Sequence, residues 1–180
     1  MTAGRPAEAA SLFEQTAGLV RGWDARVAMR SDLFATLAYQ LAGDRASAIA
    51  SRSRAVGSVE LASIQDPVVL RLLLETQTST DGPVEGFSPR AVRAALGRVE
   101  MRRGAPQSAL LAWRAAESEL GALPSLERLR LSQAEALSGL GQDEAAMAML
   151  VGLAQTEVRS EALVMLGLVQ LRRGQHSMAL

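Results

Sequence analysis

Glycine and alanine recur at fixed intervals in the second half of this chain, and this recurrence limits the possible folds more than any other feature. Three times, a small residue is followed seven residues later by a glycine and twelve residues later by an alanine. The three sets are Gly97, Gly104 and Ala109; Ala134, Gly141 and Ala146; and Gly167, Gly174 and Ala179. Successive turn glycines lie 37 and 33 residues apart, a length typical of repeated helical hairpins. The spacing predicts a row of stacked antiparallel helix pairs.

The composition favours an all-α fold. Hydrophobic residues make up 48% of the 180 residues and aromatic residues only 3%, so the core must consist of Ala, Leu and Val, which suit close helix packing. All 19 basic residues are Arg, and Lys, Asn and Cys are absent, a bias typical of GC-rich bacterial genes. A chain of this length buries enough surface to fold without a disulfide or a metal ion. We expect no cofactor and no metal.

Charge and hydropathy argue against two classes of partner. The 19 basic residues balance 19 acidic residues, so no long-range field attracts phosphate backbones and we expect no nucleic-acid partner. No segment approaches the roughly 18 apolar residues of a spanning helix, and no apolar signal region follows Met1, so we expect a soluble chain without membrane insertion. The absence of Cys leaves both a cytoplasmic and a periplasmic location open.

Start and stop signals place the helices of the second half. Ser88 as N-cap, Pro89 at the first helical position and Gly104 at the end predict a helix over 88–104. Further helices are predicted over 106–120, 125–139 and 143–154, and from residue 157 onward.

Two glycines of the repeat fall inside predicted helices. A helix-interior glycine costs about 1 kcal/mol relative to Ala, so Gly97 and Gly167 predict places where a neighbouring helix approaches closely. The residues expected to meet them are Ala109, Ala146 and Ala179.

The first half follows the same plan less regularly. Gly4-Arg5-Pro6 followed by Ala9 and Phe13 matches the spacing of Gly104-Ala105-Pro106 followed by Ala109 and Trp113, so the chain is expected to open on a return helix. Helices are then predicted over 31–42 and 44–56, with a short or distorted pair over 58–77 whose second helix starts at Asp66-Pro67. We therefore expect degenerate helical repeats over 1–77, a loop or hinge over 78–87, and more regular repeats over 88–180, the last one incomplete.

The spacing resembles that of tetratricopeptide (TPR) repeats, whose first helix carries Leu-Gly and whose second carries an Ala and, four residues on, an aromatic. Leu96-Gly97 with Ala109 and Trp113 match this signature, and Leu166-Gly167 match its first half. The aromatic expected three residues after the first-helix glycine is missing in every copy, so the copies are degenerate. Related solenoids such as Sel1-like repeats share this spacing.

The resemblance implies an α-solenoid, a right-handed superhelix of antiparallel helix pairs whose concave groove, lined by first helices, binds a peptide, a helix or a protein. Alongside Ala94 and Ser138, the groove-facing residues would be Arg98, Met101, Arg102, Leu131, Glu135, Val164, Leu168, Leu171 and Arg172. Chaperone-binding TPR domains hold a terminal carboxylate with Lys and Asn, and this chain has neither, so such a clamp is not expected.

Two questions stay open at this stage. Val164, Leu168 and Leu171 form a second apolar stripe on their helix, which is either a binding surface or the mark of a helix buried on both sides. Trp113 is expected in the core, whereas Trp23 between two helices allows a core or a ligand-contacting position.

The function predicted is a non-enzymatic protein-protein interaction scaffold, part of a larger bacterial assembly or secretion protein. The alternative is a regulatory or sensor domain that binds a small peptide or metabolite. No catalytic residues are recognisable, and His176, the only histidine, is expected to be an ordinary surface residue. We expect a fragment of a longer repeat protein, or self-association through unpaired terminal helices in which Ala9, Leu12 and Phe13 pack on the helix before Gly174 of another copy.

Overall fold

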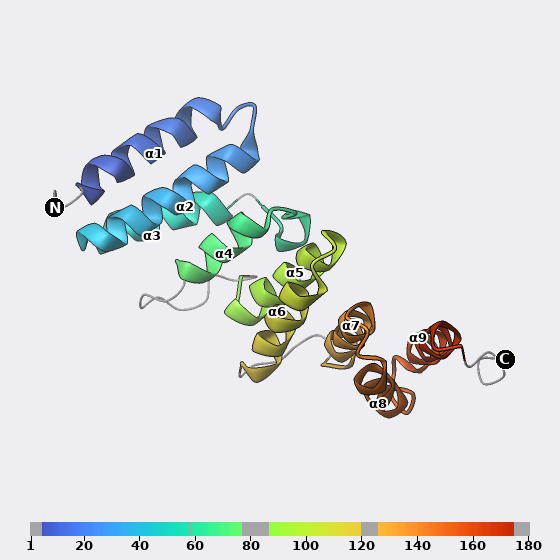
Figure 1. The fold of residues 1–180 in the computed structure, drawn as a ribbon. Helices are drawn as coiled ribbons and strands as arrows, with labels where there is room; N and C mark the ends of the chain where they lie inside the picture. Colours follow the sequence, from blue (N-terminus) through green and yellow to red (C-terminus); the bar gives the residue numbers. More distant parts are fainter. Residues whose placement is uncertain (1–4, 58, 77–86, 120–125, 175–180) are drawn as a thin grey trace. The chain divides into compact units, whose positions relative to one another are not determined.

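The computed structural model describes residues 5–57, 59–76, 87–119 and 126–174, and all regular secondary structure in these ranges is helical (Figure 1). The prediction of an all-α fold is therefore confirmed for the described residues. The chain divides into two compact units, Met1–Val92 (unit 1) and Arg93–Leu180 (unit 2). Residues 78–86 of the predicted hinge, and His176, lie outside the described residues.

Unit 1 is organised around α2 (Ala25–Ala42). Three other helices pack against it, namely α1 (Pro6–Val20), α3 (Arg45–Val56) and α4 (Pro67–Glu75). The antiparallel helices α1, α2 and α3 lie side by side in Figure 1. The core of this unit therefore lies on the buried side of α2, with Leu33 fully enclosed.

Aspartate side chains begin three helices of unit 1. Asp24, Asp44 and Asp66 each accept hydrogen bonds from backbone N–H groups of the first turn of α2, α3 and α4, which leaves fewer of those donors unsatisfied. The predicted start of α2 at Ser31 is wrong, because Asp24 caps the helix earlier and Ser31 is a buried residue within it. The predicted start at Asp66-Pro67 is confirmed.

The segment between α3 and α4 contains less helix than a hairpin repeat requires. A single 3-10 turn, Leu61–Ser63, stands where the first helix of the expected pair would lie, and α4 is only 9 residues long. The prediction of a short or distorted helix pair is confirmed, because a 3-10 turn replaces its first helix and its second helix is short. Residues 58 and 77 lie outside the described residues.

The described residues of unit 2 contain five helices, which follow one another along the chain. They are α5 (Pro89–Arg102), α6 (Pro106–Ser118), α7 (Leu126–Gly139), α8 (Asp143–Leu153) and α9 (Arg159–Arg172). Unit 2 begins within α5, at Arg93. Gly104, Gly141 and Gly174 follow α5, α7 and α9 with φ of 73°, 72° and 76°, a left-handed conformation that Gly adopts without strain. From α6 on, each helix packs on the next, and α9 also contacts α7.

Trp113 of α6 is the centre of the first core in unit 2. Only 2% of its surface is exposed, and its indole Nε1–H donates a hydrogen bond to the Ala94 carbonyl oxygen of α5 at 3.2 Å. A Cβ built on Gly97 would lie 2.3 Å from that Nε1, so α5 needs a glycine there. The close approach predicted at Gly97 is confirmed, although the nearest atoms belong to Trp113 and not to Ala109.

Gly167 of α9 has a different environment. No described atom lies within 4 Å of a Cβ built at this position, so the close approach predicted there is not found among the described residues. Its expected contact residue, Ala179, lies outside them. The second core of unit 2 instead joins α7, α8 and α9 through fully or almost fully buried residues: Ala134, Leu150, Leu153, Val158, Ala162 and Val169.

Candidate functional site

Helix α9 carries apolar residues on two sides, and only one side is buried. Ala162 and Val169 belong to the core shared with α7 and α8. Val164, Leu168 and Leu171 remain 65%, 61% and 41% exposed, and their spacing of four and three residues places them along one stripe of the helix. Within the described residues, α9 is therefore not a helix buried on both sides. This stripe is the most apolar part of the predicted groove.

Helices α5 and α9 each contact the end of α7 through one of the predicted residues. The methyl carbon of Met101 on α5 lies 3.8 Å from a Cβ built on Gly139 of α7. Arg172 of α9 donates a hydrogen bond to Ser138 Oγ at the end of α7 and forms an ion pair with Asp143 at 3.2 Å. These contacts place the predicted residues Met101 and Arg172 beside α7.

Two of the predicted residues on α5 are cationic. Arg98 and Arg102 are exposed and one helical turn apart. Partial removal from water, with a smaller effect of the Arg102 charge, lowers the pKa of the Arg98 guanidinium below its ordinary value. No described carboxylate forms an ion pair with Arg98, so this end of the surface suits an acidic group on a partner.

The predicted residues on α7 divide between core and surface. Leu131 is half-buried and packs against the core shared with α8 and α9, whereas Glu135 is exposed. Ala94 of α5, also expected on the groove, is buried in the Trp113 core and is not available to a partner. Ser138 of α7, also expected on the groove, is only 7% exposed. The predicted residues are therefore exposed at Arg98 and Arg102 and on α9, whereas the exposed surface on α7 is narrower than the pattern predicts.

The two tryptophans occupy opposite environments. Trp113 lies in the core, as predicted, whereas Trp23 is 78% exposed in unit 1. The Trp23 Nε1–H donates to the Leu19 carbonyl oxygen at 2.9 Å, which holds the indole against the end of α1. Trp23 is thus a surface residue of unit 1, while Trp113 has a structural role in unit 2.

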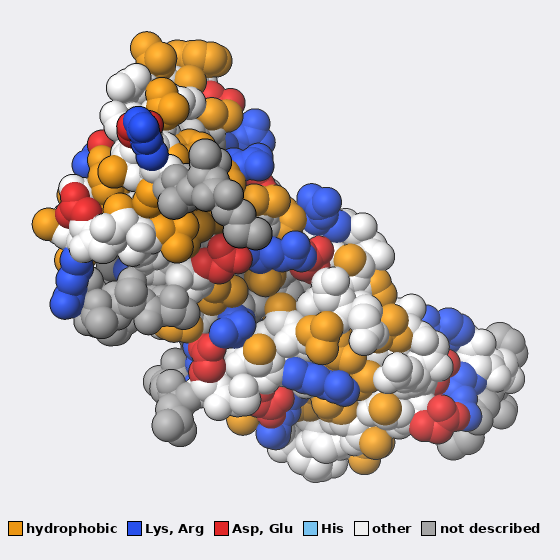
Figure 2. All heavy atoms as spheres, turned by 60° about the vertical axis from the view of Figure 1, so that its left-hand side comes forward, with side chains coloured by type: hydrophobic (Ala, Val, Ile, Leu, Met, Phe, Trp, Pro, Cys, Tyr) orange, Lys and Arg blue, Asp and Glu red, His pale blue; other side chains and the backbone are white. Residues whose placement is uncertain are grey.

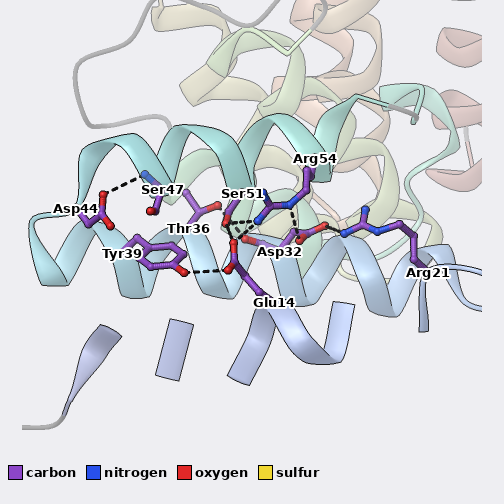
Figure 3. A network of polar contacts seen from close by, with 9 residues as sticks. All are labelled: Glu14, Arg21, Asp32, Thr36, Tyr39, Asp44, Ser47, Ser51 and Arg54. Atoms are coloured by element: carbon purple, nitrogen blue, oxygen red, sulfur yellow. Dashed lines mark hydrogen bonds and ion pairs between the residues drawn. The ribbon is translucent and has the colours of Figure 1, made fainter. Parts of the chain in front are cut away.

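Unit 1 contains a buried polar network that the sequence pattern did not identify (Figure 3). Asp32 of α2 is fully buried, with Oδ2 accepting a hydrogen bond from Arg21 at 2.8 Å and Oδ1 lying 3.6 Å from Arg54 Nε. The signal was present, because an Asp at a core position of α2 departs from the surrounding small and apolar residues. Buried carboxylates are retained only with such partners.

Glu14 of α1 completes the network from the other side. Its carboxylate accepts hydrogen bonds from Tyr39 at 2.9 Å and from Ser51 at 2.8 Å, and it also pairs with Arg54 (Figure 3). Burial by itself raises the pKa of Glu14, but the hydrogen bonds from Ser51, Tyr39 and Arg54 outweigh it and lower the pKa below 4.5. Each acid of this network is thus paired with an arginine, although Asp32 Oδ1 is buried and accepts no hydrogen bond within the described residues. The arrangement joins α1, α2 and α3.

An open apolar hollow of about 610 Å³ lies between α1 and α2. It is lined by Arg5, Pro6, Ala9, Phe13, Phe34, Leu37, Ala38 and Leu41. The Phe13 and Phe34 rings stack with centroids 5.3 Å apart, and the Arg30 guanidinium lies 5.7 Å from the Phe34 ring centroid. The hollow is therefore aromatic and aliphatic, with Arg5 in its lining and Arg30 beside the Phe34 ring.

Other kinds of site are not formed by the described residues. No group of three or more His, Asp or Glu side chains converges there to hold a metal ion. None of the described helices combines the length and the hydropathy needed to cross a lipid bilayer. On the face shown in Figure 2, hydrophobic side chains are exposed between acidic and basic ones.

The chain matches no protein-family model, and comparisons with curated proteins and with solved structures gave no match.

Proposed function

We propose that this chain is a non-enzymatic, TPR-like α-solenoid that binds a peptide, a helix or another protein along the exposed sides of α5, α7 and α9. The observation that carries this proposal is the apolar stripe of α9, because Val164, Leu168 and Leu171 stay exposed while the other side of the same helix is buried. An exposed apolar stripe on a helix is the usual receptor surface for an amphipathic partner.

The repeat-like order of the helices supports the proposal. In unit 2, antiparallel helices follow one another with a left-handed glycine after each first helix, and α7 and α9 are in contact. Helical repeats of this length expose one side of every first helix on a common surface. The arrangement belongs to proteins that work by binding, which is an analogy at the level of the fold.

The chemistry of the surface supports a particular kind of ligand. Its α9 end is apolar, whereas its α5 end carries the unpaired cation Arg98. An amphipathic helix with apolar residues at i, i+4 and i+7 and an acidic group at one end satisfies both requirements. We infer that the preferred ligand has this pattern.

The test uses a displayed library of amphipathic peptides selected against residues 1–180. Leu168→Arg places a charge in the apolar stripe, so we expect at least about tenfold weaker binding of the selected peptides. The matched control is Leu111→Arg on α6, because Leu111 is 59% exposed and Leu168 is 61% exposed. Affinity is measured by isothermal titration calorimetry, and helicity and melting by circular dichroism.

Equal affinity of Leu168→Arg and wild type would reject the proposed surface. So would an equal loss in Leu111→Arg, because the effect would then reflect total charge and not the α9 stripe. A library that yields no binder, while small metabolites raise the melting temperature strongly, would favour a sensor domain instead.

A further inference from the structure

The hairpin formed by α5 and α6 shows how two consecutive helices of this chain pack against each other. The Trp113 indole of α6 packs directly on Gly97, where a Cβ would lie 2.3 Å from Nε1. One turn away on α5, Arg93 forms an ion pair with Glu119, which follows α6. A glycine, an aromatic and one pair of side chains thus define this helix-helix contact.

Helix α9 has the same surface without a described helix upon it. Counting 70 residues on from α5 places Gly167 at the position of Gly97 and Leu163 at that of Arg93. No described atom lies within 4 Å of a Cβ built on Gly167, and Leu163 is 46% exposed. Among the described residues, nothing covers this side of α9, and it carries Leu163 where α5 carries the charged Arg93.

Helix α1 has the matching surface of a return helix. Counting 100 residues back from α6 places Phe13 at the position of Trp113 and Leu19 at that of Glu119. Phe13 lines the hollow between α1 and α2, and Leu19 is 78% exposed. Exposed leucines thus stand at the two positions of the Arg93–Glu119 ion pair: Leu163 on α9 at the position of Arg93, and Leu19 on α1 at the position of Glu119.

The neighbouring helix α2 adds charge complementarity. Along α2, Arg30 is followed by Phe34, Leu37 and Leu41, and no described acid forms an ion pair with Arg30. Along α9, the exposed Glu161 is followed by Val164, Leu168 and Leu171. If α9 lies antiparallel to α1, it runs parallel to α2. The row of residues on α9 then faces the row on α2, with Glu161 near Arg30 and the apolar residues of the two helices opposite one another.

We propose that the chain self-associates head to tail, with α9 of one copy occupying the hollow between α1 and α2 of the next. Gly167 then receives Phe13, Leu163 contacts Leu19, and Glu161 lies near Arg30. The two surfaces differ, so the contact is heterologous, and each added copy leaves one α9 and one hollow free. The chain therefore forms oligomers whose size grows with concentration. This inference goes beyond the proposed function, because it requires the hollow of unit 1, which partner binding on unit 2 does not use.

The test is sedimentation velocity on residues 1–180, from about 1 µM to about 1 mM, a range that spans weak to moderate affinities. We expect the weight-average mass of the wild type to rise through dimers and larger species. Leu41→Arg places a charge in the hollow at a residue that is 81% exposed, and Gly167→Leu fills the open surface of α9. Each variant should lower the association constant by at least about tenfold.

A mixing experiment tests the head-to-tail geometry. Leu41→Arg retains a functional α9, and Gly167→Leu retains a functional hollow, so an equimolar mixture should form a 1:1 dimer that does not grow further. The matched control is Leu111→Arg, which should associate like wild type. Circular dichroism verifies that all variants are folded, and at Gly167 an added Cβ has no described atom within 4 Å.

A wild-type chain that stays monomeric throughout the concentration range would overturn the proposal, and would mean that another segment or an unrelated protein covers α9. Unchanged association of either variant, or a mixture that fails to form dimers, would also overturn it. Peptide binding by monomeric Leu41→Arg keeps the proposed function separate, because that variant retains the α5, α7 and α9 surface.

Discussion

At the scale of single residues, two glycines at equivalent repeat positions have opposite environments. Gly97 lies against the buried indole of Trp113, whereas Gly167 faces open space within the described residues. The backbone is helical at both positions, so the cost of a helical glycine is the same and only the neighbour differs. The same substitution should therefore have opposite effects at the two sites.

We predict that Gly97→Ala lowers the free energy of unfolding by about 1 to 3 kcal/mol, because the rigid, buried indole must move to admit a methyl group. Gly167→Ala should raise it by up to about 1 kcal/mol, through helix propensity alone. Urea denaturation followed by circular dichroism measures both values. Stabilisation by Gly97→Ala would show that Trp113 does not pack against α5 in solution.

At the scale of elements, the polar network of unit 1 acts as a connection between three helices. Glu14 comes from α1, Asp32 and Tyr39 from α2, and Ser51 and Arg54 from α3. Because these groups satisfy one another only when all three helices are in register, the network disfavours packings shifted by a turn. Unit 1 thus gains specificity from the buried acid, at the cost of its desolvation.

The stability of unit 1 should depend on pH in a direction set by Glu14. Its pKa is lower in the folded chain than the ordinary value of 4.5, so it contributes stability above that pH, and the contribution is lost as pH falls through the folded pKa. Glu14→Gln should lose about 1 kcal/mol at neutral pH and show a shallower fall in stability below pH 4.5. Urea denaturation at a series of pH values, followed by circular dichroism, gives the two slopes. Parallel slopes for the variant and the wild type would contradict the prediction.

Tyr39 should make the stability of unit 1 depend on pH in the alkaline range. The hydrogen bond to Glu14, with burial and the Glu14 charge, raises the pKa of Tyr39 above 10.0. The folded state therefore favours the neutral phenol, and this contribution is complete below pH 10.0 and lost as pH rises through the folded pKa. Tyr39→Phe serves as the control, because it removes the alkaline dependence and one hydrogen bond to Glu14 without removing the carboxylate.

At the scale of the whole molecule, the chain consists of two compact units, each with buried residues of its own. Leu33 is fully enclosed in unit 1, and Leu150 is fully enclosed in unit 2. In helical-repeat architectures, stability is the sum of local terms and nearest-neighbour contacts. A cavity in one unit should therefore reduce the stability of that unit more than that of the other.

We predict that Leu33→Ala and Leu150→Ala each cost about 3 kcal/mol in their own unit. With Trp23 replaced by Phe, fluorescence comes from Trp113 alone and reports on unit 2, whereas circular dichroism reports on both units. Leu150→Ala should shift the Trp113 transition strongly, and Leu33→Ala should shift it little. Equal shifts of the Trp113 transition in both variants would show that the chain unfolds as a single cooperative unit.

The sequence alone determined the helical class, most helix boundaries and the left-handed glycines, because these depend on local spacing, caps and turn residues. Pro89, Pro106 and Gly104 act through the backbone of their own helix, so their effect is visible without tertiary structure. The boundary missed in α2 shows the limit, since both Asp24 and Ser31 can cap a helix and packing decided between them.

Only the tertiary structure decided which surfaces stay exposed. The sequence pattern of α9 allows its second apolar stripe to be buried or open, and helix contacts left Val164, Leu168 and Leu171 at the surface. The same holds for Asp32, whose partners Arg21 and Arg54 are 11 and 22 positions away in the sequence. Residues distant in the chain become neighbours only through packing, so periodicity predicts which side of a helix is apolar but not what, if anything, covers it.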